Sequence, residues 1–250
     1  MGKQRAFIPY LTAGFPTPAV SLEALRCVVA AGADFVEVGV PFSDPLADGP
    51  TIQRTTQAAL EQGMTVPRVL ELIRQAALGV PVIIMTYLNP VLAYGVQRFA
   101  KEAHDAGAAG VVLTDLPAGA DPDVERAVTS SSLALIRLVA PTTDDARLKT
   151  ALTGASGFVY LISRLGVTGA RADVPPDLDA QVQRVRAASP SPSHLPVAVG
   201  FGIGTAAQAA AAARSADGVV VGSALMDALA KGGIPAMERL TRELATAVHA

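Results

Sequence analysis

Short apolar runs alternate with helical patterns along the whole chain. Within each run both faces are apolar, which is typical of a parallel strand covered by helices on both sides of the sheet. Between the runs, apolar residues recur at helical spacing, as at 66–77, 96–107 and 235–248. The runs predict strands near 6–12, 35–40, 82–86, 110–114, 133–139, 157–162, 197–200 and 218–221.

The order of these elements indicates the fold class. About eight strands, each followed by a helix or a helix-bearing loop, predict an α/β protein built as a single (β/α)8 TIM barrel. A doubly wound open sheet is the alternative, but the even spacing and the lack of GxGxxG after the first strand favour the barrel. The 250 residues could also form two smaller domains. No linker or shift in composition divides the chain, so we expect one domain over 1–250.

Composition and charge exclude several classes of function. Half of the residues are hydrophobic, 17% are charged and the net charge is −2, which favours a large core and gives no sign of a nucleic acid or membrane partner. No apolar run approaches the roughly 20 residues of a membrane span, and no signal peptide is recognisable, so we expect a cytoplasmic protein. Cys27 is the single cysteine, and the three histidines match no zinc-ligand spacing, so no metal site is expected.

A single carboxylate interrupts the apolar strand predicted at 35–40. Glu37 shares a strand face with Phe35, opposite Val36 and Val38. If this face points into the mouth of the barrel, desolvation raises the pKa of the carboxyl group toward the range useful for proton transfer. The alternative is a structural glutamate paired with an arginine or lysine, because a buried glutamate without a partner is rare.

A second carboxylate follows in the loop after this strand. Asp48 lies in the segment PFSDPLADG, which its prolines stiffen and Gly49 turns. Such a loop can fold back and bring Asp48 toward Glu37, so that one carboxyl group shuttles protons while the other stays ionised. Turn and helix-cap chemistry is the alternative for Asp44 and Asp48. A metal site is disfavoured because the carboxylates show no ordered ligand spacing.

Glycine-rich segments follow the last three predicted strands, at 166–169, 200–204 and 222–223. Backbone N–H groups at glycines and at helix N-termini bind anions, and the loops after strands 7 and 8 are the usual phosphate site of this barrel. Glycine is common in any such turn, but three segments in these loops favour a phosphorylated substrate. The 200–204 and 222–223 segments contain no lysine or arginine, so backbone dipoles would carry most of the recognition.

Other segments supply candidates for a lid and for an aromatic pocket. The loop at 163–177 is longer than most β–α connections, and its place beside the phosphate segments favours a lid over a disordered insertion. Most strand residues are simply core, but several at the ends of strands 1, 3 and 6 could line a flat pocket. These are Leu11, Phe15, Thr86, Tyr87, Asn89 and Tyr160.

Seven segments, in order and over nearly the whole chain, resemble the alpha subunit family of tryptophan synthase. They are FIPYLTAGFP, FVEVGVPFSDPLADGPTIQ, MTYLNPVLAYG, VVLTDLP, VYLISRLGVTGAR, VGFGIG and GVVVGSALM. The second is the most specific. The resemblance implies retro-aldol cleavage of indole-3-glycerol phosphate to indole and glyceraldehyde 3-phosphate in tryptophan biosynthesis. It implies no cofactor in this chain, and a partner beta subunit that carries pyridoxal phosphate in an alpha2-beta2 heterotetramer.

The resemblance also implies residue roles. Glu37 matches the proton-shuttling glutamate of the family, and Asp48 matches the aspartate that holds the ring N–H. Tyr160 matches a tyrosine of the indole pocket, and Thr168 matches a lid threonine that contacts the aspartate. The positions that match the phosphate site are Gly169, Gly202, Gly222 and Ser223.

Two other functions stay open on the sequence. A non-catalytic barrel subunit could modulate a partner, although the presence of both Glu37 and Asp48 argues against it. Another phosphate-binding barrel enzyme of the same pathway is the second alternative. A synthase of the indole precursor would need a catalytic lysine at a strand end, and none of the four lysines is expected there.

Overall fold

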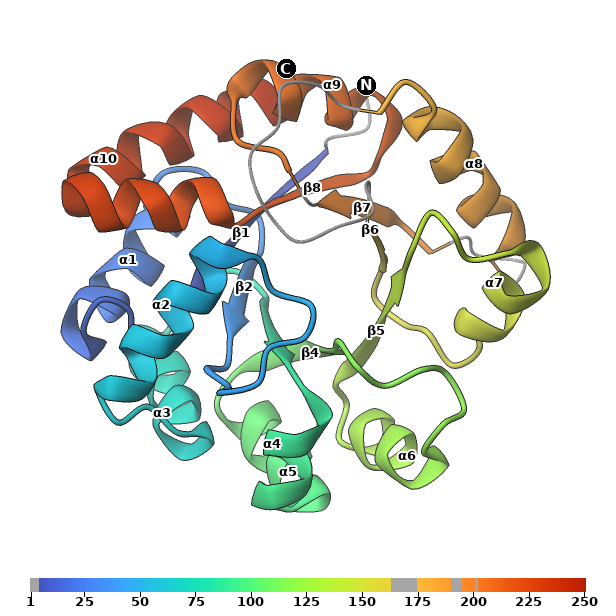
Figure 1. Cartoon of the computed structure of the whole chain (residues 1–250), viewed down its shortest axis with the longest axis horizontal. Coiled ribbons are helices and arrows are strands. Elements are labelled where there is room, and N and C mark those ends of the chain that lie inside the picture. Colours follow the sequence, from blue (N-terminus) through green and yellow to red (C-terminus); the bar gives the residue numbers. More distant parts are fainter. Residues whose placement is uncertain (1–4, 163–174, 190–194, 201) are drawn as a thin grey trace.

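Eight parallel strands close into a barrel in the computed structural model of the chain (Figure 1). Each strand pairs with the next along the chain, and β8 returns to pair with β1, so the open-sheet alternative is wrong. The structure describes residues 5–162, 175–189, 195–200 and 202–250. The strands are β1 (Ala6–Thr12), β2 (Val36–Gly39), β3 (Val82–Thr86), β4 (Ala108–Leu113), β5 (Ala134–Val139), β6 (Val159–Ile162), β7 (Val197–Gly200) and β8 (Gly218–Val221).

Helices form the outer ring of the barrel (Figure 1). Several begin with a proline in the first turn or with a side-chain cap, as at Thr17 and Thr205, whose hydroxyl groups accept hydrogen bonds from backbone N–H groups. The helices are α1 (Pro18–Ala30), α2 (Pro50–Glu61), α3 (Val66–Ala76), α4 (Leu88–Tyr94), α5 (Val96–Asp105), α6 (Pro122–Ser130), α7 (Asp145–Ala151), α8 (Leu178–Ala188), α9 (Ala206–Ser215) and α10 (Ser223–His249).

Helix α10 contains the helical pattern predicted at 235–248 and a shorter helical segment before it. Gly233, with φ 63° and ψ −163°, kinks it, and Pro235 opens the second half. The short first half begins at Ser223, and only Gly222 separates it from the end of β8 at Val221. This placement leaves the first N–H groups of α10 at the carboxyl edge of the barrel.

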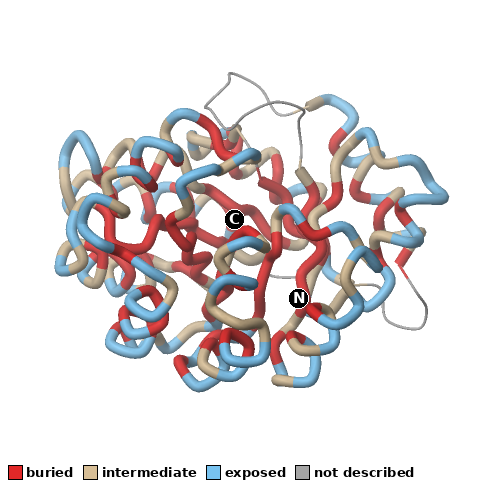
Figure 2. The backbone as a smooth tube through the Cα atoms, turned by 60° about the horizontal axis from the view of Figure 1, so that its bottom comes forward, coloured by how far each residue is buried: buried red, intermediate tan, exposed pale blue. Residues whose placement is uncertain are grey.

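The core follows from strands that are buried on both faces. Every residue of β2, β7 and β8 is buried, and the buried tube segments run through the centre of the molecule in Figure 2. Helices add apolar faces from outside, such as Val69, Leu70 and Ile73 of α3. No helix in the described ranges is long and apolar enough to cross a membrane.

The strand register decides which side chains share the interior. Tyr10 of β1 pairs with Glu37 of β2, and Glu37 pairs with Ile83 of β3. Burial, and after it the charge of Glu37, raises the pKa of Tyr160, which lies on β6 across the barrel. The side chains of Tyr10, Glu37 and Tyr160 therefore point into the same interior space.

Candidate active site

Glu37 is a buried acid with no cationic partner in the described part of the chain. Its side chain is 3% exposed, and Oε2 has no hydrogen-bond partner among the described residues. Desolvation, reinforced by the charge of Asp48, raises the pKa of Glu37 to about 8. The group is therefore mainly protonated at neutral pH, and the structure gives no support to a structural ion pair at this position.

Asp48 lies beside this acid, at the end of the loop that joins β2 to α2. It is 9% exposed. Burial raises its pKa, whereas a hydrogen bond from the hydroxyl group of Tyr87 lowers it. The hydrogen bond favours the charged form of Asp48, so the loop does bring the two carboxyl groups together in different surroundings.

Tyr87 fastens this loop to the neighbouring strand. It follows β3, and its Oη accepts a hydrogen bond of 3.0 Å from the N–H group of Ala47 while it donates to Asp48. Its ring lies 5.3 Å from that of Phe42, centroid to centroid. On the other side, Nε2 of Gln53 donates to the carbonyl oxygen of Asp48 at 2.7 Å. The sequence indicates Tyr87 only as a pocket wall, because its anchoring role depends on how close the ends of β2 and β3 lie.

Two tyrosines reach into the interior over glycines. A Cβ atom added to Gly39 would lie 2.0 Å from Oη of Tyr10, and one added to Gly200 would lie 2.4 Å from Oη of Tyr160. Both glycines thus make room for a hydroxyl group. Burial raises the pKa of both tyrosines, so both stay neutral. The sequence analysis did not identify Tyr10 as a site residue. Tyr10 and Thr12 lie two positions apart on β1, so the pattern could have shown that both side chains share one face of the strand.

The candidate phosphate site lies across the mouth, where β7 and β8 end side by side. Gly222 occupies the position before α10, and Ser223 is its first residue; both are partly exposed. Gly202 adopts φ 82°, a conformation that favours glycine. The unpaired N–H groups at the start of α10 can bind an anion here.

Some of the sequence predictions receive less support. Thr168 and Gly169 lie outside the described residues, as does most of the loop at 163–177. Phe15 is buried in the turn after β1, and Asn89 is exposed in the first turn of α4. Neither has a hydrogen bond to Glu37 or Asp48 in the described ranges, so their roles stay predictions. Those ranges also hold no group of three His, Cys, Asp or Glu side chains suited to a metal ion.

Comparison with known proteins identifies the family. The model of the family described as "Tryptophan synthase alpha chain" matches residues 1–249. The chain belongs to the tryptophan synthase alpha chain family. It is 44% identical to the tryptophan synthase alpha chain of Methanosarcina acetivorans, over 98% of this chain and 89% of that protein. A structure of Mycobacterium tuberculosis tryptophan synthase matches with a TM-score of 0.91 and 42% identity, over 99% of this chain and 94% of that one.

A second structure agrees with this assignment. The tryptophan synthase alpha subunit of Legionella pneumophila has a TM-score of 0.87 and 37% identity, covering 98% of this chain and 92% of its own. Alpha chains of tryptophan synthase are the indole-3-glycerol-phosphate lyase subunits, a class of carbon–carbon lyase. The family pairs with a beta subunit in an alpha2-beta2 complex, and the beta subunit carries the pyridoxal phosphate. The comparisons do not favour a non-catalytic subunit or another barrel enzyme of the pathway.

Proposed function

We propose that Glu37 and Asp48 are the catalytic pair with which this chain cleaves indole-3-glycerol phosphate to indole and glyceraldehyde 3-phosphate. The observation that carries the proposal is the contrast between the two carboxyl groups. Glu37 is buried without a hydrogen-bond donor to Oε2, and Asp48 accepts a hydrogen bond from Tyr87. An acid that is protonated at neutral pH therefore stands beside a carboxyl group whose charged form receives a hydrogen bond.

The first chemical step uses both groups. Protonated Glu37 donates its proton to the ring carbon that bears the glycerol phosphate side chain, and this creates positive charge on the ring. The Asp48 carboxylate accepts a hydrogen bond from the ring N–H and stabilises that charge. Because both groups lie in a site of low polarity, their interaction with the developing charge is stronger than it would be in water.

The second step returns the proton. Glu37, now a carboxylate, removes the proton from the side-chain hydroxyl group next to the ring, and the carbon–carbon bond breaks as the aldehyde forms. The bonding electrons return to the ring and neutralise its nitrogen. Indole and glyceraldehyde 3-phosphate leave, and Glu37 is again protonated, so that no proton is gained or lost.

Substrate orientation follows from the two ends of the site. The phosphate binds to backbone N–H groups near Gly202, Gly222 and Ser223, and the ring extends toward Glu37 with Tyr160 as a wall. For Thr168 and Gly169, the roles that the resemblance implies are a contact with Asp48 and a contact with the phosphate, respectively. Fixing the phosphate at one end places the ring carbon near the carboxyl group of Glu37. Such positioning can lower the activation barrier by several kcal/mol. We further propose that residues 1–250 form one domain and that the chain works in the cytoplasm.

Indole release from indole-3-glycerol phosphate by the full chain tests this function, with Glu37→Gln as the decisive variant. The substitution keeps the size of the side chain and removes the proton shuttle, so turnover should fall at least about 100-fold. Binding of the substrate phosphate should persist, because Gly202 and Ser223 are untouched. Turnover of the variant at the wild-type rate would remove Glu37 from the mechanism.

A further inference from the structure

We propose that Asp227 is a positioning residue that holds the Asp48 loop in register with the phosphate site. It acts through a contact between α2 and α10 that we call the α2–α10 clamp, formed by Thr51, Arg54 and Asp227. The proposal rests on the function proposed above for Asp48 and adds a residue to the same site.

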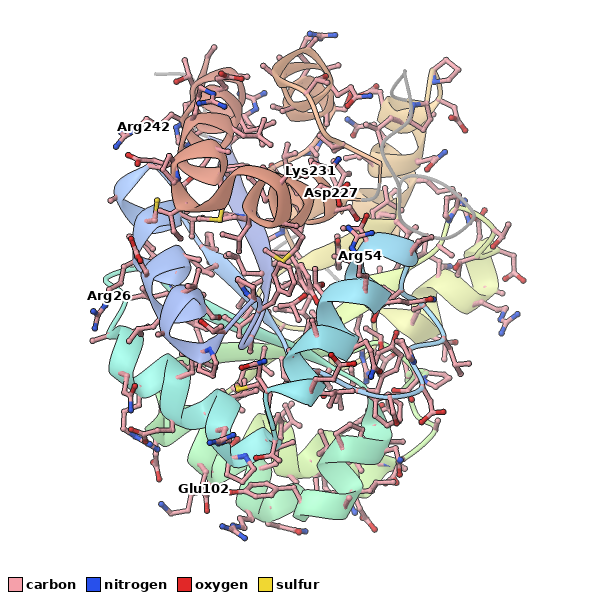
Figure 3. The ribbon with its side chains drawn as sticks, turned by 60° about the vertical axis from the view of Figure 1, so that its left-hand side comes forward. Arg26, Arg54, Glu102, Asp227, Lys231 and Arg242 are labelled. Atoms are coloured by element: carbon pink, nitrogen blue, oxygen red, sulfur yellow. The ribbon has the colours of Figure 1, made fainter. Side chains whose placement is uncertain are left out.

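The clamp consists of three polar contacts on one carboxylate. Oγ1 of Thr51 donates to Oδ1 and Oδ2 of Asp227 at 3.2 and 3.3 Å, and Nη2 of Arg54 lies 2.7 Å from Oδ1. Figure 3 shows Arg54 on α2 and Asp227 on α10 directed toward each other. The partners are more than 170 residues apart in sequence, so the contact fixes one element against another.

Each side of the clamp lies within about one helical turn of one end of the substrate site. Thr51 stands in the first turn of α2, directly after the loop that ends with Asp48 and Gly49. Asp227 follows Ser223 by four residues and therefore lies on the same face of α10, one turn further from the phosphate. A rotation of the first turn of α2 would move Asp48, and the clamp opposes that rotation from the phosphate side.

A buried contact sets the spacing of the same two helices from beneath. Oγ1 of Thr12 on β1 lies 2.8 Å from Oγ1 of Thr55 on α2, and the N–H group of Thr12 donates to Sδ of Met226 at 3.3 Å. Helices α2 and α10 therefore stay packed when the clamp is removed. The outer contact then controls the orientation of the first turn of α2, which follows the loop that carries Asp48.

Solvent exposure argues against a mainly stabilising role. The side chains of Arg54 and Asp227 are 57% and 34% exposed, and ion pairs this open to water contribute about 0–1 kcal/mol to stability. The Arg242–Glu238 pair has similar exposures, 57% and 39%, and a similar distance of 2.6 Å, but it lies within α10 and joins nothing to the site. Arg242→Ala is therefore a matched control for the loss of an exposed ion pair.

Steady-state indole release by the full chain in complex with its cognate beta subunit tests the clamp. Asp227→Ala should lower kcat about tenfold, because misplacing a catalytic group by less than an ångström costs rate without unfolding. The KM for indole-3-glycerol phosphate should change less than about twofold, because the backbone groups that bind the substrate phosphate remain in place. Asp227→Asn keeps a hydrogen-bond acceptor for Thr51, so its kcat should fall less than that of Asp227→Ala. Arg242→Ala should retain the wild-type kcat.

A double-mutant cycle separates positioning of Asp48 from general damage. Once Asp48→Asn has removed the group that the clamp positions, adding Asp227→Ala should cost no further activity. Two results would overturn the proposal. One is that Asp227→Ala lowers kcat by the same factor in the wild type and in Asp48→Asn. The other is that Asp227→Ala alone has the kcat of the wild type. These outcomes leave the role of Glu37 untouched, so the clamp can fail while the proposed function stands.

Discussion

The two carboxyl groups, one loop apart, are placed in different surroundings. Burial, reinforced by the charge of Asp48, raises the pKa of Glu37, and Oε2 has no hydrogen-bond donor in the described part of the chain. Asp48 keeps a hydrogen bond that favours its charge, supplied by Tyr87. The hydroxyl group of Tyr87 opposes the effect that burial has on the pKa of Asp48, and Oε2 of Glu37 has no such donor among the described residues.

Tyr87→Phe removes that hydroxyl group and should shift the acidic limb of activity. The hydrogen bond lowers the pKa of Asp48, so without it the pKa rises, and Asp48 becomes protonated and ineffective at a higher pH. The midpoint of the ascending limb of kcat against pH should therefore move up. Tyr94→Phe is the matched control, because Tyr94 also donates to a carboxylate, that of Glu102, but on the outer surface at α4 and α5. An unmoved limb in Tyr87→Phe would contradict the assigned role.

The strands and helices were largely predictable from the sequence, because apolar runs and helical spacing reflect burial directly. The bounds of β1, β3, β7 and β8 match the predicted ranges, and only the ends of the others move by one or two residues. The inward face of Glu37 and its meeting with Asp48 were also predicted. The contacts of Tyr10 and Tyr87 were not, because they depend on strand register and on which loop ends lie together.

At the scale of elements, the loop after β7 should bind phosphate through a glycine conformation. Gly202→Ala should raise the KM for indole-3-glycerol phosphate, because φ 82° is strained for alanine by about 1 kcal/mol and the strain would turn the N–H groups of the loop away. Gly119→Ala is the control. Gly119 has φ 77° and open space around it, and lies after β4, so it carries the same backbone strain without the ligand. Equal KM values for the two variants would show that the phosphate binds elsewhere.

Across the whole molecule, two apolar side chains stand out at the face where the strands end. Leu46 is 85% exposed in the Asp48 loop, and Leu92 is 48% exposed on α4; these are the large exposed hydrophobic residues among those described. Alpha chains of this family pair with a beta subunit. We expect that subunit to cover both side chains and to order the loop that carries Asp48.

Hydrogen exchange with and without the cognate beta subunit checks this expectation. Segments 41–50 and 86–95 should gain protection in the complex, and indole formation should become faster as Asp48 is held in place. Leu46→Asp should weaken the complex while the isolated chain keeps its activity, because the side chain points into solvent. Unchanged exchange in both segments, together with unchanged turnover at saturating partner, would mean that the beta subunit binds another face.

The central claim is that Glu37 enters the reaction as an acid, and its protonation state can be measured directly. Infrared difference spectra between the wild type and Glu37→Gln isolate the carboxyl stretch of this one group. The account predicts a protonated-carboxyl band at neutral pH that disappears with a midpoint near the pKa of about 8. Asp48→Asn should lower that midpoint, because the charge of Asp48 helps to raise the pKa of Glu37. A Glu37 carboxyl group that is already ionised at neutral pH would contradict the account.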